Sequence, residues 1–335
     1  MARRNTVKRV LATIALLGGS AMSLSATAHD NTRLAHIRKA GVVSCAAVQR
    51  PFLAEPGPDG KPQGLLVDVC HAIARAALNG RDHIKFTFLN GSGLFGGTAS
   101  GRADVSFGTF ADLSDDGLLS KTLPGPRVAM IHHAIMVPKA SGLHGISDLA
   151  GKAVCDMQGS GAERSLDAAL SGAGVDIVHM AYTEQSEMID AYNTGQCAAL
   201  VGESERLDAW IATQGGLRPP SHLLNKSLAA IPIMATTPRD DATWSAIVAW
   251  TVATLRAADL TGGTWRASGA AALPVPGSSL GLSADWQKEV TKNGKVSYMH
   301  LCAAEGLGAK SAKGPRATAG RVCLGPKDTP PFFAD

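Results

Sequence analysis

The sequence has no feature that marks a membrane protein, a zinc protein or a repeat protein. After residue 28, no segment is long and apolar enough for a membrane-spanning helix, which needs roughly 20 residues. No C-x-x-C pair and no cysteine–histidine cluster is present, which disfavours a zinc site. The 335 residues contain no internal repeat, and 45% of them are hydrophobic. Length and composition therefore predict one large domain or two lobes of ordinary size around a proper core.

The chain also lacks net charge once its first 28 residues are set apart. The whole sequence has 32 Lys and Arg against 28 Asp and Glu, a formal charge of +4, and such an excess can indicate nucleic acid as a partner. The excess comes from Arg3, Arg4, Lys8 and Arg9, in a segment without any acid. The remaining residues have 28 bases and 28 acids, so we expect no nucleic-acid partner.

The first 28 residues have the three-part layout of a secretory signal peptide. A basic start is followed by an apolar run over residues 10–17 and then by small residues that end in Ala26-Thr27-Ala28. The apolar run is too short to remain as a transmembrane helix. We therefore expect export to the periplasm, cleavage near Ala28, and a mature chain that does not insert into the membrane.

Six cysteines follow this segment, in three successive pairs that each enclose a few tens of residues: Cys45, Cys70, Cys155, Cys197, Cys302 and Cys323. Many pairings are possible in principle. In an oxidising compartment, each bridge would stabilise the fold by roughly 3 kcal/mol, mainly by restricting the unfolded chain. The six cysteines therefore indicate structural disulfides.

Short apolar segments rich in β-branched residues alternate with helical patterns from residue 42 onward. The predicted strands cover residues 42–48, 84–89, 105–107, 134–137, 153–155, 177–180, 198–201 and 231–235. The predicted helices cover residues 65–78, 163–170, 184–192, 205–212, 241–258 and 285–292. This alternation predicts an α/β fold with mostly parallel sheets.

Six short patterns occur in a fixed order along the chain: Ile37-Arg38-Lys39-Ala40-Gly41, Gly64-Leu65-Leu66-Val67-Asp68-Val69-Cys70, Phe95 with Gly101 and Asp104, Met136-Val137-Pro138-Lys139, Leu149-Ala150-Gly151-Lys152-Ala153-Val154-Cys155, and Ala191-Tyr192-Asn193-Thr194-Gly195-Gln196-Cys197. The ordered set, with its cysteines, resembles the periplasmic solute-binding proteins of polar and general amino-acid ABC transporters (bacterial extracellular solute-binding protein family 3). The likeness covers most of residues 36–300.

The resemblance implies a two-lobe, hinge-bending α/β fold of the periplasmic-binding-protein type (type II), with the ligand in a cleft between the lobes. It implies a first lobe from residues 29–130 and 232–335 and a second from residues 131–231, with crossovers near Met130 and Ile231.

It also implies the disulfides Cys45–Cys70 and Cys155–Cys197, which leaves Cys302 with Cys323. The implied partners are a small-molecule ligand and the membrane subunits of an ABC transporter. We expect a monomer without cofactor, metal or catalytic residues.

Two segments supply the candidate site of the second lobe. Ser160 and Gly161 lie in Gly159-Ser160-Gly161-Ala162-Glu163, where the Ser160-to-Glu163 spacing is that of a capping box. Amides at a helix start can also hold a carboxylate, and the resemblance implies contact with the ligand's α-carboxylate here. For Glu203, the resemblance implies an acceptor for the ligand's amino group. The alternative for Glu203 is an acid stabilised by a helix dipole alone.

The segment 108–116 is where the sequence departs from the family. At the position of Asp116 the family has an arginine that clamps the α-carboxylate. Residues 103–126 contain no arginine, and the acids Asp112, Asp115 and Asp116 lie in this segment instead. Since an aspartate repels a carboxylate, we expect an amine-bearing ligand; the alternative is a solvated acidic loop.

The family's aromatic stacking residue falls near Gln49, with Phe52 and Phe95 close in sequence. The predicted first-lobe side of the site therefore consists of Phe52, Leu94, Phe95, Thr109, Asp112 and Asp116. A nucleotide site at the G-x-G-x-x-G of residues 91–96 is disfavoured, because only a short helix fits there. Adjacent His132 and His133 on a strand point to opposite faces and cannot share a metal.

The leading hypothesis is a periplasmic solute-binding protein that captures a small polar, amine-bearing, amino-acid-like ligand for an ABC importer by hinge closure, without catalysis. One alternative is an exported accessory or interaction protein of the same fold that docks onto a periplasmic enzyme. Another is a periplasmic enzyme of the dehydratase type, which would need an acid such as Glu203 or Asp112 in a closed cleft.

Overall fold

The computed structural model describes residues 32–89, 92–110, 118, 120–213, 219–224, 227–260 and 275–292. The predicted signal peptide, the acids Asp112 and Asp116, and the Cys302–Cys323 pair lie outside the described residues. Among the described helices, none combines the length and the hydropathy that a membrane span requires.

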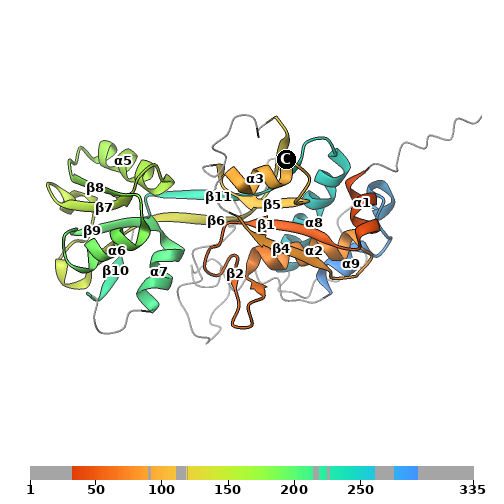
Figure 1. Cartoon of the computed structure of the whole chain (residues 1–335), viewed down its shortest axis with the longest axis horizontal. Helices are drawn as coiled ribbons and strands as arrows, with labels where there is room; N and C mark the ends of the chain where they lie inside the picture. Colours follow the sequence, from red (N-terminus) through yellow and green to blue (C-terminus); the bar gives the residue numbers. More distant parts are fainter. Residues whose placement is uncertain are drawn as a thin grey trace, which may run out of the picture.

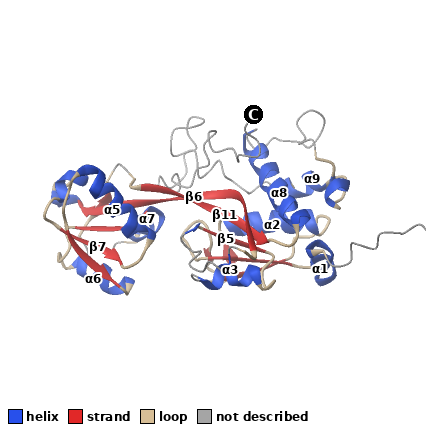
Figure 2. Ribbon diagram, turned by 90° about the horizontal axis from the view of Figure 1, so that it is seen from above, coloured by secondary structure: helices blue, strands red, loops and turns tan. Residues whose placement is uncertain are grey.

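The described chain forms two lobes, each with strands and helices, and two long strands run from one lobe into the other (Figure 1, Figure 2). The long strands are β6 (Thr122–Pro138) and β11 (Ala229–Pro238). They lie at the centre of a nine-stranded sheet with the order β4-β1-β5-β11-β6-β9-β7-β8, in which β10 also pairs with β6. The predicted two-lobe α/β architecture is confirmed.

The first lobe has a parallel sheet packed with helices. β1 pairs in parallel with β4 on one side and β5 on the other. Burial follows the sequence pattern: the alternating Ile84, Phe86 and Phe88 pack against the core, and α2 is buried almost all round. The elements of this lobe are α1 (Arg33–Ala40), β1 (Val43–Ala47), β2 (Glu55–Pro56), β3 (Pro62–Gln63), α2 (Leu65–Ala77), β4 (Ile84–Phe88), α3 (Ser92–Ala99), β5 (Val105–Gly108), α8 (Ala242–Leu260) and α9 (Trp286–Thr291).

Polar contacts attach the late helices α8 and α9 to this lobe. The Trp244 indole donates a hydrogen bond of 2.8 Å to the carbonyl of Asp104. The Arg75 guanidinium of α2 donates to the carbonyls of Glu289 and Val290 in α9. The carbonyls at the end of α9 need a donor when they are covered, and Arg75 supplies it. The contacts fix residues that are 140 to 215 positions apart in sequence.

The second lobe has a second parallel set, in which β7 pairs with both β8 and β9. Its buried side chains form two clusters, with Leu166 and Val154 in one and Tyr192 and Met188 in the other. The elements are β7 (Ala153–Met157), α5 (Gly161–Ala173), β8 (Val178–Tyr182), α6 (Gln185–Asn193), β9 (Ala199–Glu203), α7 (Ser204–Ala212) and β10 (Ser221–Leu223).

The two lobes are joined where β6 and β11 pair in antiparallel register. Met130 lies opposite Pro232, and Ile131 lies opposite Ile231, so the two predicted crossover points are neighbours in space. The register shifts just beyond this point, because the consecutive residues Ile233 and Met234 pair with Ala129 and Arg127 and skip Val128 of β6. Two adjacent strands that cross together are a suitable hinge, because both can bend at one place.

The buried side chains of β6 change from one core to the other near this point. Val128, Ala129 and Ile131 pack in the first lobe, whereas Ala134 and Ile135 pack in the clusters of the second. The change falls between Ile131 and Ala134. The lobe boundaries at residues 130/131 and 231/232 stay a prediction.

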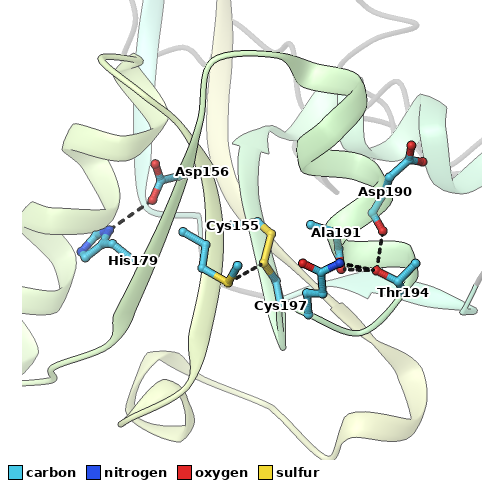
Figure 3. The surroundings of a disulfide bond; sticks show 9 residues. Cys155, Asp156, His179, Asp190, Ala191, Thr194 and Cys197 are labelled. Carbon is cyan, nitrogen blue, oxygen red and sulfur yellow. Dashed lines mark hydrogen bonds and ion pairs between the residues drawn. A yellow bond between two sulfur atoms is a disulfide. The ribbon is translucent and has the colours of Figure 1, made fainter.

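Two disulfides form within the lobes, as expected. Cys45 of β1 is bonded to Cys70 of α2, and Cys155 of β7 is bonded to Cys197, in the turn between α6 and β9. Figure 3 shows the second bridge with the hydrogen bond from the Thr194 hydroxyl to the carbonyl of Asp190, which orders that turn. Each bridge therefore links a strand to the helix or turn beside it, and neither restricts movement between the lobes.

Candidate functional site

A cleft of about 920 Å³ lies between the two lobes. Its polar lining comes from the segments that follow the carboxyl ends of β1, β5, β7 and β9, where α/β sheets generally place ligand sites. The lining residues are Arg50, Thr109, Phe110, Ile131, His133, Gly159, Ser160, Gly161, Arg164, Ser165, Ala168, Ala169, Glu203, Leu228, Ala229, Ile231 and Pro232. Residues of both lobes and of both hinge strands therefore contribute to one cavity.

The second-lobe wall is the start of α5, where the Ser160 half of the predicted capping box is present and Glu163 reaches the amide of Gly159 instead of that of Ser160. The Ser160 hydroxyl accepts a hydrogen bond of 3.0 Å from the amide of Glu163, and the Glu163 carboxylate accepts one from the amide of Gly159. The Gly161 amide lies in the first helical turn, where amides have no acceptor within the helix. The Arg164 guanidinium donates to the carbonyl of Gly159 and lines the same wall. Amides, helix dipole and guanidinium together suit a ligand carboxylate.

Glu203, at the end of β9, faces Arg50 of the first lobe across the cleft. Nε and Nη2 of Arg50 lie 3.0 to 3.2 Å from the Glu203 carboxylate oxygens. Arg206, one turn further along α7, donates to Glu203 at 3.0 Å and to the carbonyl of Gln49 at 2.7 Å. The Arg50 and Glu203 side chains are 4% and 18% exposed. An ion pair with little access to water thus connects the lobes within the candidate site.

The surroundings of Glu203 fix its ionisation. Burial acts to raise the pKa of this carboxyl, but the charges of Arg50 and Arg206 and their hydrogen bonds outweigh burial and lower the pKa below its ordinary value. Glu203 is therefore a carboxylate at neutral pH. Its charge is matched by two guanidinium groups.

His133 lies beside this ion pair, in register with Glu203 across β6 and β9. Burial lowers its pKa, and its Nδ1 lies 2.8 Å from the Ser165 hydroxyl oxygen. His132 points to the other face, where its Nδ1 lies 3.7 Å from Glu205. The alternation predicted for the two histidines is confirmed. Among the described residues, no group of three or more His, Cys, Asp or Glu could hold a metal ion.

The first-lobe wall differs from the predicted one. Thr109 lines the cleft as expected. Leu94 and Phe95 do not, because α3 packs on β5 and β11 and both side chains are buried in a small core cluster. Phe52 is not among the lining residues either; it lies in a tight turn with a φ of 65°. Asp112 and Asp116 are outside the described residues.

The lining residues that the sequence did not assign to the site include Arg50, Phe110 and Arg164. Arg50 lies three residues beyond the carboxyl end of β1, which is the sheet edge where the other site segments also lie. This position in the sequence could have indicated that Arg50 belongs to the site. The family resemblance places the carboxylate-binding arginine near Asp116 and gives no role to the position of Arg50. Phe110 adjoins Thr109 and is 53% exposed, so an aromatic face is present in the cleft although neither Phe52 nor Phe95 supplies it.

Comparison with known proteins places the fold. No family model matches the chain. YhdW of Escherichia coli O157:H7, whose name assigns it to the amino-acid ABC transporter-binding proteins, is 24% identical over 303 residues, which cover 87% of this chain and 86% of YhdW. The glutamate/glutamine/aspartate/asparagine-binding protein BztA of Rhodobacter capsulatus is 24% identical over 256 residues, which cover 73% of each chain.

A solved structure agrees with these relatives. The ABC transporter/periplasmic binding protein from Brucella ovis with glutathione bound matches with a TM-score of 0.64 at 22% identity, over 77% of this chain and 86% of its own. This likeness shows the two-lobe fold. The cleft between the lobes is therefore the place to look for a ligand.

Proposed function

We propose that this chain, a divergent relative of the solute-binding proteins of amino-acid ABC transporters, captures a small polar, amino-acid-like ligand for an importer. The cleft is the observation that carries this proposal: both lobes line it, with Arg50 and Thr109 on one side and Ser160 and Glu203 on the other. A cleft of about 920 Å³ has room for such a ligand, and bending of β6 and β11 would close the lobes around it.

The chemistry of the second-lobe wall indicates how the ligand is held. Its carboxylate would accept hydrogen bonds from the amides at the start of α5 and pair with Arg164. The aromatic ring of Phe110 would cover an apolar part of the ligand from the first lobe. Ligand binding in the cleft would thereby join the two lobes.

We propose binding without catalysis, because the relatives are binding proteins. Ser165 lies beside His133, as a nucleophile lies beside a base, but its hydroxyl donates its hydrogen to the carbonyl of Gly161. A hydroxyl has one hydrogen, so His133 is the donor in its contact with Ser165 and does not act as its base.

Export to the periplasm, cleavage near Ala28 and a monomeric state belong to the same proposal, with the membrane subunits of an ABC transporter as partners. Relatives of this type and the signal-like start of the sequence support it.

A thermal-shift screen tests the proposal. The twenty amino acids and glutathione would be added at up to millimolar concentration, and at least one should raise the melting temperature, because a ligand that binds only the folded chain stabilises it. For that ligand, Arg164→Gln should weaken binding by about tenfold, the loss expected for one charge-assisted hydrogen bond.

Arg102→Gln is the matched control, since Arg102 is an exposed arginine of the first lobe outside the cleft. It should bind like the wild type. A screen in which no compound shifts the melting temperature would overturn the proposed function, as would equal effects of the two arginine substitutions.

A further inference from the structure

Glu203 is the residue of the cleft that would accept a ligand's ammonium group, and its oxygens are already engaged. Three N–H groups reach its carboxylate: Nε of Arg50, which is shared between both oxygens, Nη2 of Arg50 and Nε of Arg206, so that each oxygen has two contacts. A carboxylate offers about four lone-pair positions to donors. A ligand ammonium would have to displace a guanidinium to bind there.

Displacing Arg50 would be costly. Its side chain is 4% exposed, so separating it from Glu203 carries a penalty, because water has little access to replace the carboxylate. The gain from a new ammonium–carboxylate pair would be offset by that penalty. Glu203 therefore offers a ligand amine little net affinity.

The backbone holds Arg50 in this position. Its amide donates to the carbonyl of Ala54 at 2.8 Å, and its carbonyl accepts from the amides of Leu53 and Ala54. The turn also contains Pro51, which restricts the backbone further. The guanidinium thus starts from a fixed point at the end of β1 and reaches Glu203 of the other lobe without a large loss of conformational freedom.

The remaining charge in the cleft favours an anion. Among the described lining residues, the guanidinium groups are those of Arg50 and Arg164, and the carboxylate is that of Glu203. The start of α5 adds the positive end of a helix dipole.

We infer, taking the proposed function as given, that Arg50 is an internal counter-ion that fills the cation-accepting position of Glu203, so that the cleft recognises its ligand through a carboxylate and not through an α-ammonium. Arg50 is thus a specificity-determining residue. Removing it converts Glu203 into an ammonium acceptor.

Matched pairs of ligands test this inference. Each pair consists of an amino acid and the same acid with hydrogen in place of the α-ammonium: L-glutamate with glutarate, L-glutamine with glutaramate, and L-arginine with 5-guanidinovalerate. Dissociation constants are measured by calorimetry for the wild type, the single variants Arg50→Gln and Glu203→Gln, and the double variant Arg50→Gln/Glu203→Gln.

In the wild type, the members of a pair should bind within about threefold of each other. In Arg50→Gln, the amino acid should bind at least about tenfold more tightly than its partner, because the exposed carboxylate gains a charge-assisted hydrogen bond. The double variant should lose that preference, since it has no carboxylate. Arg102→Gln should behave as the wild type.

Three results would overturn the inference: a wild-type preference for the amine of tenfold or more that Glu203→Gln abolishes, no gain in Arg50→Gln, or a gain that persists in the double variant. If circular dichroism shows that Arg50→Gln does not fold, Arg50→Lys replaces it. A lysine keeps the positive charge but leaves part of the Glu203 carboxylate without a hydrogen-bond donor. If the wild type binds no small ligand but Arg50→Gln gains amine binding, the proposed function is refuted, whereas the assignment of Arg50 as the counter-ion that fills the acceptor position of Glu203 is supported.

Discussion

Breaking the ion pair between Arg50 and Glu203 gives a quantitative test of the contact between the lobes. The closest nitrogen–oxygen distance is 3.0 Å, and both side chains are largely buried. At an effective dielectric constant of roughly 20, unit charges about 4 Å apart attract by about 4 kcal/mol. Removal of one partner from a buried pair costs about 3 to 5 kcal/mol, because the other charge stays buried. We expect Glu203→Gln to lower the free energy of unfolding by about 3 kcal/mol, and Arg50→Gln by less, because Arg206 still neutralises Glu203.

The assay is urea unfolding of the wild type, both single variants and the double variant at neutral pH and low salt. The double variant should be more stable than the sum of the single losses predicts, by about 2 kcal/mol or more. Additivity within about 0.5 kcal/mol would refute the view that these side chains form one buried pair.

The same pair has a defined pH dependence. The pKa of Glu203 in the folded chain lies below its ordinary value of 4.5. The contribution of the carboxylate to the free energy of unfolding is therefore complete above pH 4.5 and is lost as the pH falls through the lowered pKa. The stability advantage of the wild type over Glu203→Gln should therefore be constant near neutral pH and shrink in acid. An advantage that grows on acidification would contradict the assignment.

The remaining predictions concern three other sites. Replacing Cys155 and Cys197 by serine should lower the free energy of unfolding by about 4 kcal/mol, the chain-entropy value for a sequence separation of 42 residues, measured by urea unfolding; an unchanged midpoint would contradict this. Burial lowers the pKa of His133 below 6.5. The contribution of the neutral imidazole to stability is therefore complete above pH 6.5 and is lost as the pH falls through the lowered pKa. His133→Asn should reduce the slope of the unfolding free energy against pH just below pH 6.5. An unchanged slope would show that another group causes it. Gly64, before α2, has a φ of 116°, and a Cβ there would lie 2.6 Å from the carbonyl oxygen of Leu53. Gly64→Ala should lower the free energy of unfolding by about 2 kcal/mol or more in the same assay, and an unchanged free energy would show that the turn adapts.

The alternating strands and amphipathic helices were predictable from sequence because local pattern and burial agree in them. The predicted strand at 84–89 is β4, and the predicted helix at 65–78 is α2. The length of β6 was not predictable, because Pro124, Gly125 and Pro126 interrupt the local signal for a strand. Pairing with β11 extends it through those residues, so tertiary contacts override local propensity there.

The helix Arg33–Ala40 was missed although its ends carry ordinary signals. Thr32 caps its start, because its hydroxyl oxygen accepts a hydrogen bond from the amide of Ala35, and Gly41 ends it with a φ of 70°. Its hydrophobic face is short, with Leu34 and Ile37 as the buried residues, which left the periodic pattern weak.

The second-lobe side of the site was predictable because the capping box and the end of β9 are local features. Ser160, Gly161 and Glu203 all line the cleft. The partner of Glu203 was not predictable, because Arg50 lies 153 positions away in sequence and meets Glu203 only through the pairing of the two lobes.

The central claim is that the cleft between the lobes binds an amino-acid-like solute through a carboxylate. Calorimetric titration of the chain with the acid that gives the largest thermal shift tests it most directly, with Arg164→Gln and Arg102→Gln titrated in parallel. We predict one saturable site per chain, weakened about tenfold in Arg164→Gln and unchanged in Arg102→Gln. Absence of saturable binding, or equal affinity in all three proteins, would contradict it.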